Sequence, residues 1–308
     1  MKIYKLILCS SIALLLFACD KEDALTPSNA KENYYAADSD ATDPVSVLRQ
    51  EFFKRDSSYL LFNDTLRHNL LGKDGNGNNV YFTETVDIGY TMTSNTMPEK
   101  YTYKYIESLD DKKAAVTFLE SNILPHLSTK LRPFSWLLVK DISEYVTDDY
   151  GASYTYQGDD SYAVGDRCTA IAMSGLSNLD NEGLHEFAQS LLSGILVNKI
   201  NKQSSSLLDQ FTKYCSPIYE TYYSGTMPTT DSDNMVLMEQ SGFIVPYYFY
   251  IYMLYGYFPS KSDDISSYVK LVVNNTENEV KSIYGNYPIV MSKYYIMKSI
   301  LLNLGYVS

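Results

Sequence analysis

The pattern of apolar and polar residues predicts a long amphipathic helix over residues 180–199. Apolar side chains return at spacings of three and four along this stretch, which gives the helix one buried stripe, and Asp180 stands at the expected N-cap position. The stripe consists of Leu184, Phe187, Ala188, Leu191, Leu192, Ile195 and Leu196. Further helices are expected over 44–55, 110–124, 206–214, 259–273 and 289–304.

Shorter apolar runs between these helices predict strands. Buried strands are expected over 59–62, 134–139 and 169–173, and a glycine-rich turn over 72–79 leads into a strand over 80–83. The stretch 145–162 is expected to be a polar insertion, and 220–239 to be mostly loop. This order of elements predicts an α+β fold in which a small mixed or antiparallel sheet packs on helix 180–199, followed by a mostly helical C-terminal half.

The first residues have the pattern of a bacterial lipoprotein leader. A charged start and a short apolar run over 6–17 are typical of a signal peptide over 1–19, and the run is too short to span a membrane. The segment Leu16-Phe17-Ala18-Cys19 resembles a lipobox, in which Cys19 is acylated and anchors the protein to a membrane. The alternative is ordinary secretory cleavage. We expect 20–42 to be a flexible tether and 43–308 to be a single domain, with a sheet-containing half over about 43–180 and a helical half over about 181–308.

Composition narrows the classes of ligand. The formal net charge of −12 is unfavourable for contact with a nucleic-acid backbone, so nucleic acid is not expected as a partner. The 30 tyrosines suit either sugar-stacking surfaces and interfaces or, more commonly, the edge of a hydrophobic core. Outside the leader, Cys168 and Cys215 either form one disulfide or remain two buried thiols.

The predicted helix 180–199 carries part of a zinc-peptidase motif. His185-Glu186-Phe187-Ala188 matches the first four positions of H-E-x-x-H, in which two histidines one turn apart bind zinc and the glutamate activates water. The fifth position is Gln189, whose neutral amide oxygen is a poorer zinc ligand than an imidazole. The motif is therefore a working site, an altered site or a relic, and an ordinary half-buried histidine remains the alternative.

Two later segments extend this pattern. They are Gly242-Phe243-Ile244-Val245-Pro246-Tyr247 and Asp263-Asp264-Ile265-Ser266-Ser267. With the lipoprotein leader and the H-E-F-A helix, their order resembles the zinc-binding metallopeptidase lipoproteins that accompany starch-utilisation-type glycan uptake systems, which are gluzincin-like. The resemblance implies a zincin-like fold and an outer-membrane, lipid-anchored location. The acidic residues directly after Cys19 look like a surface-export tag, which favours exposure at the cell surface.

The resemblance also implies roles for single residues. His185 would be the first zinc ligand, Gln189 would replace the second, and Asp263 would be the third. Glu186 would be the catalytic base, and either Tyr247 or Tyr257 would stabilise the oxyanion.

Because Gln189 weakens the metal site, we predict a pseudo-peptidase with no bound cofactor. It would be a non-catalytic binding or accessory protein for peptide or glycan in a nutrient uptake system, with outer-membrane uptake components as partners. The alternative is an active zinc peptidase with a His/Gln/Asp site, or one whose missing ligand is His126 or Glu182.

The triplet Asp64-Thr65-Leu66 has two interpretations. It resembles an acceptor for bacterial O-glycosylation in the periplasm, and it also suits the start of a helix after the 59–62 strand.

Overall fold

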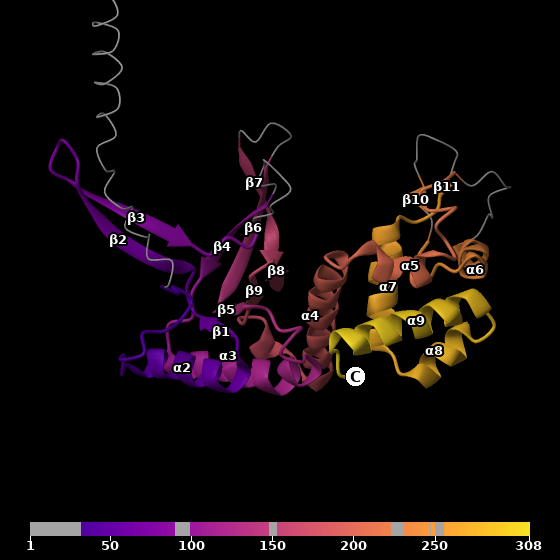
Figure 1. The fold of residues 1–308 in the computed structure, drawn as a ribbon, viewed down its shortest axis with the longest axis horizontal. Helices are drawn as coiled ribbons and strands as arrows, with labels where there is room; N and C mark the ends of the chain where they lie inside the picture. Colours follow the sequence, from indigo (N-terminus) through magenta and orange to yellow (C-terminus); the bar gives the residue numbers. More distant parts are fainter. Residues whose placement is uncertain (1–31, 90–98, 148–152, 223–230, 247, 250–255) are drawn as a thin grey trace, which may run out of the picture. The chain divides into compact units, whose positions relative to one another are not determined.

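The computed structural model describes residues 32–89, 99–147, 153–222, 231–246, 248–249 and 256–308 (Figure 1). The chain divides into two units, and all the described helices and strands belong to the second, Tyr35–Ser308. The predicted leader 1–19, its lipidation site Cys19 and the candidate Tyr247 lie outside the described residues. Among the residues that are described, no helix has both the length and the apolar character needed to cross a membrane.

The second unit contains a four-stranded mixed sheet with the order β1-β5-β9-β8. The strands are β1 (Tyr59–Leu61), β5 (Ser135–Val139), β9 (Cys168–Ala172) and β8 (Tyr162–Val164). β1, β5 and β9 run parallel, and β8 pairs antiparallel with β9 at the edge. Every residue of β5 is buried, as expected for an apolar strand that is covered on both faces. The predicted strands over 59–62, 134–139 and 169–173 are confirmed.

The two faces of this sheet belong to different hydrophobic clusters. Trp136, Leu138 and Ile171 share one cluster with residues of the helices, whereas Leu137 and Val139 share the other with Ile142. Ile142 belongs to a second sheet, whose strands are β4 (Glu99–Lys104), β6 (Asp141–Thr147) and β7 (Tyr154–Asp160), in the order β4-β6-β7.

The second sheet corrects one prediction. The predicted polar insertion 145–162 instead supplies the end of β6, all of β7 and the first residue of β8, with 148–152 outside the described residues. Polar side chains dominate because β7 is mostly exposed and every residue of β6 except Ile142 is only half-buried. Ile142 is the strongest apolar signal that either strand offers, so the alternation typical of a strand is hidden.

A two-stranded hairpin precedes β4. β2 (Thr65–Lys73) pairs antiparallel with β3 (Asn79–Thr85). The predicted glycine-rich turn is confirmed, because the carboxylate of Asp74 accepts hydrogen bonds from the backbone N–H groups of Asn76 and Asn78 at 2.9 and 2.8 Å. The predicted helix start at Asp64-Thr65-Leu66 is wrong, since Thr65 begins β2. The hydrogen bonds between β2 and β3 compete with those of a helix and favour the strand conformation of this segment.

The helices follow the sequence pattern closely. The predicted helices correspond to α2 (Pro44–Asp56), α3 (Leu109–Asn122), α4 (Asn181–Asn201), α5 (Ser205–Thr212), α7 (Lys261–Asn274) and α9 (Pro288–Leu304). The predicted loop 220–239 is partly wrong, because it contains most of α6 (Asp231–Ser241). The sequence analysis also missed α8 (Glu277–Tyr284). Short elements complete the described chain: the 3-10 turns η1 (Leu124–His126) and η2 (Leu176–Asn178), and the strands β10 (Tyr248–Phe249) and β11 (Gly256–Tyr257).

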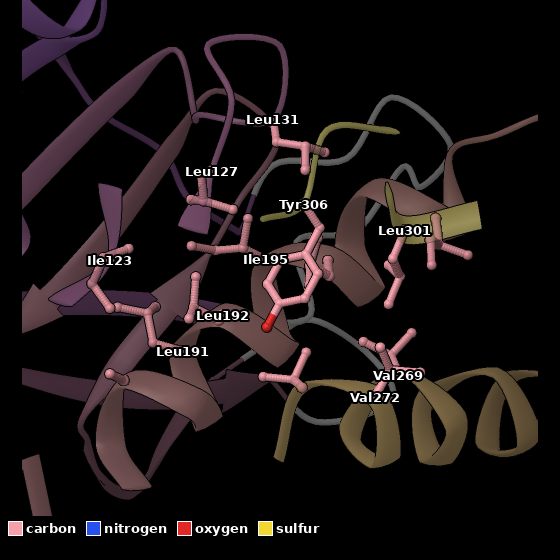
Figure 2. Close-up of a cluster of buried hydrophobic side chains, with 14 of the residues drawn as sticks. Ile123, Leu127, Leu131, Leu191, Leu192, Ile195, Val269, Val272, Leu301 and Tyr306 are labelled. Carbon is pink, nitrogen blue, oxygen red and sulfur yellow. The ribbon is translucent and has the colours of Figure 1, made fainter. Parts of the chain in front are cut away.

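Helix α4 lies at the centre of the main core. Its buried residues Leu191, Leu192 and Ile195 share one cluster with side chains from the end of α3, from α7 and from α9. Figure 2 shows these labelled side chains gathered around the ring of Tyr306, which follows the last helix. α4 therefore packs on both α7 and the edge strand β8 (Figure 1). A mixed α/β architecture with small sheets is confirmed.

The folded unit begins earlier than predicted. The ring of Tyr35 packs edge-on against Phe134 with centroids 5.0 Å apart, and Arg49 donates a hydrogen bond to the carbonyl of Tyr35 at 2.9 Å. Gln50 in α2 also binds the carbonyls of Asp38 and Ala41. Residues 35–42, which were expected to belong to a flexible tether, are therefore held against the folded unit.

Cys168 and Cys215 are free, buried thiols, so of the two alternatives the disulfide does not form. They lie in different hydrophobic clusters. Burial raises the pKa of the Cys168 thiol to about 12, which keeps this side chain protonated and unreactive at neutral pH.

Candidate functional site

The H-E-F-A-Q segment occupies the second turn of α4. Asp180 caps this helix by accepting a hydrogen bond from the N–H of Gly183 at 2.9 Å. His185 and Glu186 are exposed and Gln189 is half-buried, because the apolar stripe on the other face takes the buried positions. Phe187 and Ala188, which lie between His185 and Gln189, face the protein and pack against it. Ala188 is buried, and the ring of Phe187 lies 5.7 Å from Phe118 and 6.1 Å from Tyr162.

The predicted third ligand, Asp263, has a structural role at the start of α7. Its Oδ2 accepts hydrogen bonds from the backbone N–H and the hydroxyl of Ser260 at 3.3 and 2.5 Å. In return, the Ser260 hydroxyl accepts a hydrogen bond from the Asp263 N–H at 3.1 Å. This arrangement is a capping box, which satisfies backbone donors that the first turn of a helix leaves free. The Oδ2 atom of Asp263 is therefore already used within its own helix.

The structure shows the local surroundings of three further candidates, Tyr257, His126 and Glu182. Tyr257 is half-buried in β11 and pairs with Tyr248 and Tyr222. His126 is held by a contact of its Nδ1 atom with the carbonyl of Val307 at 2.9 Å, and Glu182 is exposed in the first turn of α4. Each of these side chains has a local role or faces solvent.

These residues do not fit a zinc ion. His185 offers one exposed imidazole, Gln189 offers a neutral amide, and Asp263 is bound in its cap. Within the described ranges, no three His, Cys, Asp or Glu side chains are grouped closely enough to hold a metal. Catalytic zinc sites use three protein ligands and one water, so the donor set falls short of this arrangement.

A groove of about 770 Å³ lies beside the start of α4. Buried Ile106, Ala115 and Leu176 and half-buried Phe118 and Leu184 form its apolar part. Leu184 is the residue before His185, and Phe118 is the ring that packs on Phe187. The polar part of the lining consists of Tyr105, Glu107, Ser108, Asp111, Lys140, Ser174 and Ser177. An apolar pocket of this size with a few polar groups is typical of a small-molecule or peptide site.

The groove lies at the carboxyl ends of two parallel strands. Lys140 follows β5 directly, and Met173 and Ser174 follow β9. Ser174 donates a hydrogen bond to the carboxylate of Asp141 at 2.5 Å, and this bond is the main reason that the pKa of Asp141 lies below its usual value. The crevice at the carboxyl ends of parallel strands is where α/β proteins commonly bind ligands. The sequence analysis missed the groove, although the polar residues that end the predicted strands were a signal for it.

Comparison with known proteins gives no relative, so a functional proposal depends on the geometry described above. No family model, curated protein sequence or solved structure matches the chain.

Proposed function

We propose that this protein is a lipid-anchored binding protein without peptidase activity, held at the outer membrane through Cys19 and exposed at the cell surface. It would serve a nutrient uptake system by binding a peptide or glycan in the groove beside α4. The observation that supports this proposal most strongly is the use of the Asp263 Oδ2 atom in the capping box of α7, because it engages the third candidate ligand of a site whose second position is already Gln189.

The arrangement around α4 supports descent from a zincin-like fold. The signature-bearing helix packs on α7, the helix from which the third ligand would come. It also lies beside the antiparallel edge strand β8, where the Tyr162 hydroxyl donates a hydrogen bond to the carbonyl of Ser190 at 3.0 Å. A mixed sheet, a helix next to its edge strand and a helical C-terminal half are the features that the resemblance implies.

The chemistry of the groove supports binding. Phe118, Met173 and Leu184 provide apolar contact surface, and Tyr105 is 41% exposed, which leaves its ring free to stack on a sugar or a peptide side chain. Hydroxyl groups, two carboxylates and the Lys140 ammonium offer both donors and acceptors around this surface. A ligand with alternating apolar and polar groups suits such a lining.

A binding screen with matched tryptophan variants tests this proposal. Ala114 lines the groove on α3, whereas its neighbour Lys113 is exposed on the same helix outside the lining. The purified chain is screened against immobilised peptides and oligosaccharides, and the Kd of the best ligand is then measured by calorimetry. Ala114→Trp should weaken binding by at least about tenfold because the indole fills the groove, whereas Lys113→Trp should leave the Kd unchanged.

Two outcomes would contradict the proposal. Equal loss of affinity in both variants, or in neither, would place the binding site elsewhere. Zinc-dependent hydrolysis of the peptides in the screen would show that the protein is a working peptidase.

A further inference from the structure

A second cluster of reactive groups lies in the helical half, away from the H-E-F-A-Q segment. Lys293 of α9 and Asp264 of α7 are both fully buried, and the Lys293 Nζ atom is 2.7 Å from each oxygen of the Asp264 carboxylate. Both residues stand within the apolar stripes of their helices, between Val290 and Met297 in α9 and beside Ile265 in α7. A lysine and an aspartate are thus in direct contact inside the core.

Water is excluded from this contact. The rings of Phe211, Phe243 and Tyr268 have their centroids 4.8, 5.1 and 4.6 Å from the Lys293 Nζ atom. These rings hold the ammonium by cation–π attraction, and together with the carboxylate they fix its position. Removing two ions from water is costly, however, and an uncharged amine and carboxylic acid in contact do not carry this cost. Transfer of one proton from Nζ to a carboxylate oxygen produces that neutral pair.

Three further groups contact the pair, and the first is the Cys215 thiol, whose Sγ atom lies 3.2 Å from the Lys293 Nζ atom. The carbonyl oxygen of Gly242 lies 2.8 Å from the Lys293 Nζ atom, and the Tyr219 hydroxyl donates a hydrogen bond to the Asp264 Oδ2 atom at 2.5 Å. Gly242 adopts a positive φ of 90°, and a Cβ atom there would lie 2.4 Å from the Ile289 side chain. Only glycine fits this turn without strain, so the backbone is shaped to present its carbonyl to the lysine.

We propose that Lys293 and Asp264 form an intramolecular isopeptide bond that joins α9 to α7. The uncharged Nζ atom attacks the Asp264 carboxyl carbon. The Tyr219 hydroxyl donates a hydrogen bond to Oδ2 and so draws electron density away from this carbon. A bond forms between Nζ and Cγ, one C–O bond breaks, and the departing oxygen leaves as water with one proton from the carboxylic acid and one from the amine. The step involves no oxidation and no co-reactant, and the contact between the two groups supplies the proximity that favours it.

The product would fit the same surroundings. The amide N–H has the Gly242 carbonyl as its acceptor, and the amide oxygen has the Tyr219 hydroxyl as its donor. The amide carries no charge and both of its polar atoms remain hydrogen-bonded, which is what the interior of a protein requires. The bond would also close a covalent loop from residue 264 to residue 293 and so restrict the unfolded chain.

Tryptic digestion of the purified full-length chain tests this proposal directly. Trypsin cuts after lysine, and an acylated lysine is not cut. The expected product is a branched peptide in which 262–270 is joined to 282–298, with a mass equal to the two linear peptides minus one water. Fragmentation should place the branch at Asp264 and Lys293. Lys293→Arg should abolish the branched peptide, because the guanidinium keeps the charge but does not form the amide.

Tyr219→Phe tests the role of the hydroxyl. It should lower the fraction of branched peptide, because the variant loses the hydrogen bond to Oδ2 and keeps the ring. The proposal is overturned if the wild-type chain releases the linear peptides 262–270 and 282–293 in full yield, since the contact would then be an ion pair only. Because this outcome is read from the wild-type protein, it does not depend on whether any variant folds.

Discussion

Replacing Lys293 by methionine should lower the free energy of unfolding by about 3–5 kcal/mol, because it leaves a buried aspartate without its partner. The Lys293 side chain is fully buried, and its Nζ atom contacts both oxygens of the Asp264 carboxylate. Without it, Asp264 retains the hydrogen bond from Tyr219. Burial raises the pKa of Asp264, and Lys293 opposes this effect. Without Lys293, the variant should be more stable at acidic pH, where the Asp264 carboxyl is neutral, than the same variant is at neutral pH. Urea unfolding followed by circular dichroism measures the change.

The double variant Lys293→Met/Asp264→Leu is the matched control. It removes both polar groups and replaces them with apolar side chains of comparable size, so it should be more stable than either single variant. A Lys293→Met protein with wild-type stability would contradict this account of the cluster. So would a double variant that is less stable than both single variants.

The second large effect is expected within α4. Leu191→Ala should lower the free energy of unfolding by about 2–5 kcal/mol, because Leu191 is fully buried and the substitution leaves a cavity. His185→Ala, on the exposed face of the same helix, should change it by no more than about 0.5 kcal/mol. Thermal or urea unfolding of both variants provides the comparison.

The contrast between these variants separates packing from chemistry. A large loss of stability in His185→Ala would mean that the histidine has a structural partner, and the ordinary interpretation of His185 as a satisfied helix residue would then be favoured. A small effect leaves His185 free for a ligand or a partner at the surface.

Helices with complete local signals were predictable from the sequence. Asp180 before the apolar stripe of α4, and Asp43 before Pro44 in α2, are caps that the structure confirms by hydrogen bonds to backbone N–H groups. Helix α8 was missed, although it carries an equally local signal, the capping box of Thr276 and Glu279, in which the Thr276 N–H donates to the Glu279 carboxylate at 2.7 Å. These elements depend on interactions within a few residues, so the sequence pattern is enough to place them.

The candidate site was less accessible to such reasoning. Asp263 and Asp264 are adjacent and chemically alike, yet Asp263 caps its helix and Asp264 reaches into the core towards Lys293. The spacing from Ser260 assigns the cap to Asp263 locally, whereas the contact of Asp264 with Lys293 joins residues 29 positions apart and has no local signal. The same holds for the groove, whose lining comes from four separate segments of the chain.

The measurement that tests the central claim most directly is the zinc content of the purified protein. The chain is prepared without chelators, incubated with zinc and dialysed, and metal is measured by atomic emission for the wild type, His185→Ala and Gln189→His. A protein without a working zinc site should hold no more zinc than its His185→Ala variant. Gln189→His tests the geometry, and gain of zinc in this variant would mark the site as a relic that keeps its spacing. About one zinc per wild-type chain, lost in His185→Ala, would contradict the claim and restore the peptidase interpretation.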